Sequence, residues 1–247
     1  MRLVIVAALC ASTLLIGCST HRVRIGYQTQ PAAAQRSRAL PAIAVGKFVD
    51  ERGDDAERAS DGVWIGAIRG GYGNTIKTVL VEQPLRDMVA TSFVDALKAR
   101  SSLADENSGA HVISGSVTTF ACKQYVRRDC TVALDVVLSE RLSGREIVKK
   151  KYDAYEFDGS VWAADTGIFG SVDKLRDLAS RTLTVCVDKV LDDDVLIEAS
   201  HQHGLGAPKE QSRQARDRFH ELKTLFDQGL LTKEEYESRR AAVLDDL

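Results

Sequence analysis

Aromatic residues are scarce in this sequence of 247 residues, at 6% of the chain. That scarcity disfavours a platform on which single-stranded nucleic acid stacks. The formal net charge is only −2, so no basic field draws the protein to nucleic acid. After the first twenty residues, no run is long and apolar enough to cross a bilayer. The balance of 28% charged and 44% apolar residues is typical of a folded domain.

Catalytic and metal-binding signatures are also missing. The sequence contains no G-x-S-x-G, no H-E-x-x-H and no second cysteine pair at metal-ligand spacing. Residues 66–73, GAIRGGYG, lack both the Gly-Lys-Ser/Thr ending and the G-x-G-x-x-G spacing of phosphate-binding loops. We therefore predict a protein that is not an enzyme and has no catalytic residues, cofactor or metal. A hydrolase site assembled from His111, Asp158 and Asp165 is an alternative that no spacing supports.

The first eighteen residues have the layout of a secretory signal. A short positive start is followed by an apolar run over residues 3–16, then by Gly17 and Cys18. A cleaved signal with an incidental cysteine is the simpler interpretation. The stretch LIGC at 15–18, however, resembles a bacterial lipobox, which implies signal cleavage after Gly17 and acyl chains such as palmitate on Cys18. Ser19 implies, by the same resemblance, an outer-membrane protein facing the periplasm.

Composition divides the rest of the chain into segments. Residues 18–39 are polar and show no sustained period, so we predict a flexible tether behind the lipidated cysteine. Its arginines either rest on anionic headgroups or are simply solvated. The expected segments are the signal peptide 1–17, the tether 18–39, a core domain 40–195, a linker 196–213 and a helical hairpin 214–247.

The core domain shows alternating strand and helix patterns. Pro84 suits the first turn of a helix, and the apolar residues that follow it recur on one helical face. The predicted fold class is α+β, a two-layer domain of β-α-β-β-β-α order with a mostly antiparallel sheet and two helices on one face. The expected strands are 40–50, 110–122, 130–143 and 145–157, and the expected helices are 85–100 and 171–193.

Two cysteines flank a short loop between expected strands. Cys122 ends one strand and Cys130 begins the next, so antiparallel pairing brings them within disulfide range. In an oxidising compartment we predict a Cys122–Cys130 bridge, worth about 2–3 kcal/mol on the entropic account. Two buried free thiols are the alternative. Cys186 lies on an apolar helix face and is expected to be an inert core thiol.

The glycine-rich stretch before Pro84 has large apolar side chains among its glycines, including Trp64, Ile65, Ile68 and Tyr72. In a flexible loop they form a partner-binding surface. Alternatively, they fill the edge of the core. If Trp64, Tyr72 and Trp162 instead line a pocket, they favour a ligand-binding protein.

Three stretches together, VGKFVDERGD, IGAIRGGYGN and PLRDMVATSFVDALKAR, resemble the YajG-like group of bacterial envelope lipoproteins over about residues 40–192. The resemblance implies an outer-membrane-anchored domain without a recognised catalytic centre. Asp50 and Arg52, in its Asp-x-Arg motif, are expected to form a structural ion pair. An exposed pair would contribute under about 1 kcal/mol.

The C-terminal segment has the pattern of two short helices. Gly229 stands at a helix end, and Thr232 with Glu235 forms a capping box for the next helix. The segment resembles the short domain called SHOCT, which implies an oligomerisation or recruitment module. So short a pair of helices needs a surface to pack on, which is its own core, a second copy or a partner. The expected contact residues are Phe219, Leu222, Phe226, Leu231 and Tyr236.

These features predict a lipid-anchored envelope lipoprotein that acts as a non-enzymatic binding or assembly module. Besides the membrane at Cys18, we expect a protein partner or a homo-oligomer, contacted through the hairpin and the glycine-rich loop. The alternative is an envelope lipoprotein that binds a lipid or glycan.

Overall fold

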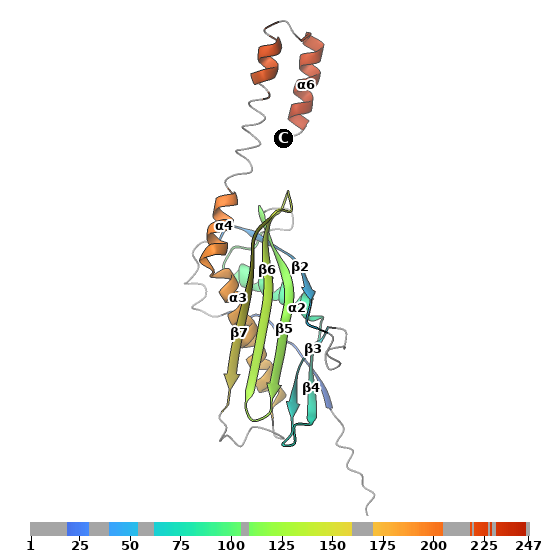
Figure 1. Cartoon of the computed structure of the whole chain (residues 1–247), viewed down its shortest axis with the longest axis vertical. Helices are drawn as coiled ribbons and strands as arrows, with labels where there is room; N and C mark the ends of the chain where they lie inside the picture. Colours follow the sequence, from blue (N-terminus) through green and yellow to red (C-terminus); the bar gives the residue numbers. More distant parts are fainter. Residues whose placement is uncertain are drawn as a thin grey trace, which may run out of the picture.

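The chain folds around one mixed β-sheet (Figure 1). The computed structural model describes residues 19–29, 40–53, 62–104, 109–159, 170–204, 218, 220–226, 228 and 231–245. Within them the sheet has seven strands in the order β1-β4-β3-β5-β6-β7, with β2 also paired to β5. The elements are β1 (Ser19–Val23), β2 (Ile43–Asp50), β3 (Trp64–Arg69), β4 (Thr75–Val81), α2 (Leu85–Ala99), β5 (His111–Gln124), β6 (Arg128–Glu140), β7 (Glu146–Asp158), α3 (Val172–Leu191), α4 (Asp194–Gly204) and α6 (Lys233–Asp245).

Two long helices pack on this sheet and on each other. Helix α2 contacts β2 and β5, and α3 contacts β5, β6 and β7. Figure 1 shows both helices behind the strands. Burial of their apolar faces forms the core, as the helical periodicity of the sequence predicts. In α2 the buried apolar residues are Leu85, Met88, Val89, Phe93, Ala96 and Leu97.

The α+β class is confirmed, but the predicted element order lacks β1, β3 and β4. Strands β3 and β4 form a hairpin inside the glycine-rich stretch. Gly66 is required there because a Cβ would collide with the carbonyl oxygen of Cys122. Gly73, with φ of 80°, makes the turn. The sheet is mixed: the long β5–β6 and β6–β7 pairs and the β3–β4 hairpin are antiparallel, as predicted, whereas the β1–β4, β2–β5 and β3–β5 pairs are parallel.

The segment boundaries also differ from those expected. Residues 19–29 belong to the fold and are not a flexible tether, because β1 pairs with β4 over its whole length. Residues 196–204 are not linker, because α4 includes them and contacts α3, β6 and β7. Leu196 and Ile197 are buried there. The signal peptide 1–17 and Cys18 lie outside the described residues.

One row of paired residues crosses the whole sheet and defines an end of the domain. It consists of Ser19, Lys77, Ile68, Gln124, Arg128 and Asp158. We name this the Ser19 end. The β3–β4 loop 70–74 and the β5–β6 turn 125–127 lie just beyond the row. Helix α3 also begins here, since Lys77 Nζ donates to the Gly170 carbonyl at 3.1 Å.

The opposite end of the sheet is the start of β5, and we name it the His111 end. His111 pairs with Glu140, the last residue of β6. Helix α3 runs back along the sheet toward this end, and α4 continues in the same direction (Figure 1). Asp193, between the two helices, accepts hydrogen bonds from Lys150 and Tyr152 of β7, at 2.5 and 2.7 Å. The C-terminal part of the chain therefore leaves the domain away from the Ser19 end.

A buried arginine fills a break in the sheet. Strand β2 pairs with β5 as far as Val117, and β3 takes over the same edge of β5 at Cys122. Between them Arg52, with its side chain only 2% exposed, donates to the carbonyls of Trp64 at 2.6 Å and Phe120 at 3.2 Å. The guanidinium thus supplies donors to two backbone carbonyls at the place where neither β2 nor β3 is paired with β5.

Asp50 holds that arginine in place. Its two carboxylate oxygens accept from Arg52 Nε and Nη2, both at 2.8 Å, in a bidentate pair. Burial would raise the pKa of Asp50, but the hydrogen bonds and charge of Arg52 outweigh it, so the pKa is lowered. The ion pair predicted from the Asp-x-Arg motif is present. It is buried on the arginine side, so the value for an exposed pair does not apply.

We expect Arg52→Met to lower the free energy of unfolding by about 3–5 kcal/mol, because the half-buried Asp50 carboxylate loses its bidentate partner and two carbonyls lose a donor. Because the folded state lowers the pKa of Asp50, this stabilisation is present above about pH 4 and is lost as the pH falls through the folded pKa. Urea unfolding at pH 7 and pH 3 measures both effects.

The matched control is Arg24→Met, which removes an exposed ion pair with Glu82 at 3.4 Å. It should cost less than about 1 kcal/mol. Equal losses for the two variants would contradict a structural role for Arg52.

Candidate functional site

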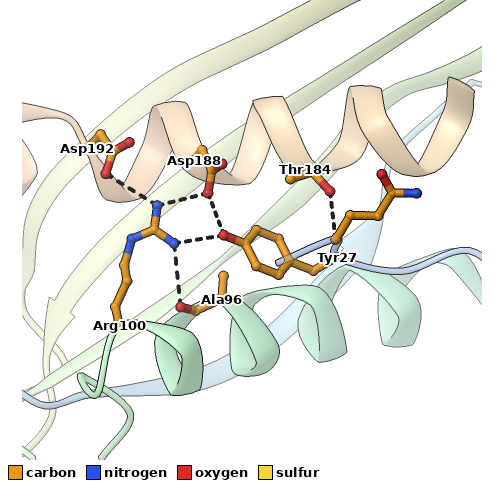
Figure 2. A network of polar contacts seen from close by, with 7 residues as sticks. Tyr27, Ala96, Arg100, Thr184, Asp188 and Asp192 are labelled. Carbon is orange, nitrogen blue, oxygen red and sulfur yellow. Dashed lines mark hydrogen bonds and ion pairs between the residues drawn. The ribbon is translucent and has the colours of Figure 1, made fainter. Parts of the chain in front are cut away.

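The segment that follows β1 is held between the two core helices by a polar network (Figure 2). Tyr27 donates its hydroxyl to Asp188 of α3 at 2.8 Å. Arg100, at the end of α2, donates to the Tyr27 hydroxyl at 3.1 Å and to Asp188 at 2.8 Å. The network thus joins three parts of the chain that are far apart in sequence.

Further contacts complete the network. Arg100 is 7% exposed and also donates to Asp192, one turn beyond Asp188, at 3.3 Å. The backbone N–H of Gln28 donates to the Thr184 hydroxyl at 2.9 Å. Burial, and then the hydrogen bond to Asp188, raises the pKa of Tyr27. The hydroxyl is therefore a stable donor at neutral pH, and residues 24–29 are locked onto the helices.

Two hollows open beside this segment. One of about 500 Å³ lies between residues 23–28, α2 and α3. Its charged lining consists of Arg24, Glu82, Asp95, Arg176 and Asp177. The other, of about 790 Å³, lies along β1 and the start of α3. Both have mixed charge, which fits a polar ligand better than an acyl chain.

The structure separates the three residues predicted in the glycine-rich loop. Trp64 and Ile68 lie in β3 and are 8% and 0% exposed. They belong to the core, so their prediction as partner-binding residues is wrong. Tyr72 sits in the β3–β4 loop and is fully exposed, at 102%. Trp64 and Tyr72 therefore line no common pocket, and Trp162 lies outside the described residues.

The predicted disulfide is confirmed. Cys122 and Cys130 are register partners on β5 and β6, and their sulfur atoms are bonded. Cys186 is free and buried, and burial raises the pKa of its thiol to about 12. Such a thiol is protonated at neutral pH and therefore unreactive.

The C-terminal residues show the predicted helical capping. The Glu235 carboxylate accepts from the Thr232 backbone N–H at 3.0 Å, and the Thr232 hydroxyl accepts from the Glu235 N–H at 3.3 Å. The rings of Phe226 and Tyr236 stack with centroids 4.9 Å apart. Leu222 and Leu231 are half-buried, while Phe219 lies outside the described residues.

The hydrolase alternative fails for the residues that the structure describes. His111 is the first residue of β5 and Asp158 the last of β7, so they lie at opposite ends of the sheet. Thirteen positions of β5 separate the two rows, which corresponds to roughly 40 Å. Asp165 lies outside the described residues, which contain no group of three or more potential metal ligands. Their helices also include none long and apolar enough to cross a membrane.

Sequence reasoning missed the network of Tyr27, Arg100 and Asp188. Tyr27 stood in a segment without any period, and 73 residues separate it from Arg100. The available signal was the spacing of Asp188 and Asp192, which places two carboxylates on one face of a helix. Two carboxylates at this spacing favour a lysine or arginine side chain nearby, but the spacing does not show which one.

Comparison with solved structures supports the fold. A protein from Xanthomonas campestris described under the family model DUF330 superposes with a TM-score of 0.51 at 14% identity, over 74% of this chain and 99% of that one. An uncharacterised protein gives 0.44 at 10% identity, over 71% and 97%. A lipoprotein from Neisseria meningitidis gives 0.24 at 14% identity, over 59% and 96%. No family model and no curated protein matches the sequence. The chain therefore shares the fold of the Xanthomonas protein.

We expect Tyr27→Phe to reduce the free energy of unfolding by about 0.5–1.5 kcal/mol, because Arg100 and Asp188 each lose one hydrogen bond while their own ion pair remains. Amide exchange at Gln28 should accelerate. Since the pKa of Tyr27 is raised on folding, its contribution is present below about pH 10 and is lost as the pH rises through the folded pKa. Tyr72→Phe is the control, because that side chain is fully exposed. Unchanged exchange at Gln28 would show that the segment is held by other contacts.

Proposed function

We propose that this protein is a lipid-anchored envelope lipoprotein that acts as a non-enzymatic binding or assembly module. It is anchored in the outer membrane through acyl chains on Cys18 and faces the periplasm. The observation that carries the proposal is the polarity of the domain. The lipobox cysteine immediately precedes Ser19 at one end of the sheet, whereas α3 and α4 lead the chain toward the other end. The anchor would therefore hold one end of the domain at the membrane, and the C-terminal hairpin would contact other molecules away from it.

The hairpin is the proposed contact element. Figure 1 shows α6 away from the sheet, beyond α4. Its packing within the described residues is the Phe226–Tyr236 ring pair, and Phe226 is still 37% exposed. Two helices of this length bury too little surface to be stable alone. A partner or a second copy of the hairpin would supply the missing apolar contact, as the SHOCT-like pattern implies.

A non-enzymatic role is supported by the positions of the perturbed groups. The described groups with a shifted pKa include Asp50, Tyr27, Cys186, Tyr152 and Asp193, and the shifts of these five arise from burial or from contacts that hold the fold together. The YajG-like pattern agrees, since its Asp-x-Arg motif serves the sheet break described above.

The hollow under residues 23–28 favours a second candidate, a ligand-binding lipoprotein. Its charged lining suits a glycan fragment rather than a lipid tail. Asp95→Ala and Arg176→Ala would weaken glycan binding measured by calorimetry if this is the function. Their effect on partner cross-linking should then be nil.

Lipidation predicts a specific mass. The mature chain should begin at Cys18 and carry a diacylglyceryl group and an N-acyl chain, measured by intact mass spectrometry of membranes. Cys18→Ser should abolish both processing and the added mass. Cys10→Ser, in the apolar run of the signal, is the matched control and should leave both unchanged. An unmodified N-terminus at residue 18 or 19 would contradict the anchor.

Recruitment through the hairpin predicts that cross-linked adducts in intact cells disappear when the chain ends at Ala207. Phe226→Ser should remove most of them as well, because it destroys the stacked pair. Val195→Ser changes an exposed apolar residue of α4 and should keep all adducts. The masses of the adducts distinguish a partner from a second copy. Adducts that persist in the truncated chain would exclude the hairpin as the recruiting element.

A further inference from the structure

Exposed apolar side chains gather at the Ser19 end. Tyr72 lies in the β3–β4 loop, Tyr125 and Val126 in the β5–β6 turn, and Tyr155 and Phe157 near the end of β7. These five are most of the large hydrophobic residues exposed in the described part of the chain. The others, Val49, Leu142, Val195 and Phe226, are scattered singly over other elements.

Direct contacts make the cluster one continuous surface. The Tyr125 hydroxyl donates to the Gly71 carbonyl at 2.9 Å, which joins the two loops. Arg127 donates to the Tyr155 hydroxyl at 2.9 Å and lies over the Phe157 ring, 5.1 Å from its centroid. A small domain has no need to organise exposed aromatic residues in this way for its own stability.

Two cations at this surface form ion pairs, and a third forms none within the part of the chain that the structure describes. Lys123 pairs with Asp129 at 3.6 Å, and Arg128 pairs with Asp158 at 3.4 Å. Arg127 is exposed and has no carboxylate partner among the described residues, since its contacts are with the two aromatic rings. Tyrosine rings around an unpaired arginine are the combination found where proteins meet phospholipid headgroups.

The position of the lipid anchor indicates that a membrane covers this surface. Cys18 is one peptide from Ser19, so its Cα lies about 3.8 Å from that of Ser19. Ser19 is paired to Lys77, and among the described residues the loop 70–74 and the turn 125–127 extend beyond that row. The network at Tyr27 holds the chain after β1 onto the helices, so the anchor has no slack that would let the domain drift away.

We infer that the Ser19 end lies flat on the membrane that holds the lipid of Cys18, with Tyr72, Tyr125, Val126 and Arg127 among anionic headgroups. This inference rests on the proposed lipid anchor and adds a fixed orientation to it. The sheet then stands on the membrane, and α4 and the C-terminal hairpin project from the far side. A flexible tether, in contrast, would give no preferred orientation.

The test measures the depth of single probes in the full lipidated chain. Tyr72→Cys or Val126→Cys is labelled with a small environment-sensitive fluorophore, while the native cysteines are lipidated, disulfide-bonded or buried. The protein is reconstituted in phosphatidylethanolamine–phosphatidylglycerol vesicles, with and without bromine near the headgroup end of the acyl chains. Leu142→Cys is the matched control, because Leu142 is exposed in the β6–β7 turn at the His111 end.

Brominated lipid should quench the probes at 72 and 126 at least twofold and leave the probe at 142 unchanged. Removing the charge by Arg127→Gln should weaken the quenching at 126. Unquenched probes at 72 and 126 in protein that floats with the vesicles would overturn the inference while the anchor stands. Shielding of those probes only at high protein density would assign the surface to a second copy and overturn it too. Protein that neither floats nor carries lipid at Cys18 would overturn the proposed anchor along with it.

Discussion

The side chain of Arg52 joins two strands that share one edge of β5. Its guanidinium donates to the carbonyls of Trp64 on β3 and Phe120 on β5, at the place where β2 no longer pairs with β5 and β3 does not yet. Asp50 neutralises the guanidinium and fixes its plane, so the same two residues end β2 and allow β3 to begin. Pairing of β3 with both β4 and β5 then depends on this closure, and β1 depends on β4. One ion pair, buried on its arginine side, therefore joins β2 to both β3 and β5.

A second polar cluster holds the N-terminal segment of the fold at one end of the sheet. Tyr27, Arg100 and Asp188 tie the chain after β1 to both core helices, and β1 itself is paired with β4 from Ser19 onward. The helices return the chain to the opposite end, where α4 packs with Leu196 and Ile197. The length of the sheet therefore separates Ser19 from helix α4. That separation suits a protein that displays a contact element away from a membrane.

Local patterns explain which elements sequence reasoning could find. Helices α2 and α3 and strands β5 to β7 follow apolar periods, and their buried faces agree with those periods. The cysteine pair and the capping box are similarly local, because the partners stand eight and three positions apart. Strands β3 and β4 were hidden because glycines suggested a loop, although Gly66 is there to admit the backbone of Cys122. Trp64 and Ile68 were misassigned for the same reason.

The sequence by itself determined the α+β class, the disulfide, the two core helices and the lipobox-like start, since each depends on residues close together in the chain. Only the tertiary structure decided that residues 19–23 of the predicted tether form a strand, that Arg52 closes the sheet, and that five exposed apolar residues meet at one end. Parallel pairing and the contacts of Tyr27 join positions far apart, and no local period encodes such partners. The register of the strands places the β3–β4 loop, the β5–β6 turn and the end of β7 next to one another, so that they form a single surface.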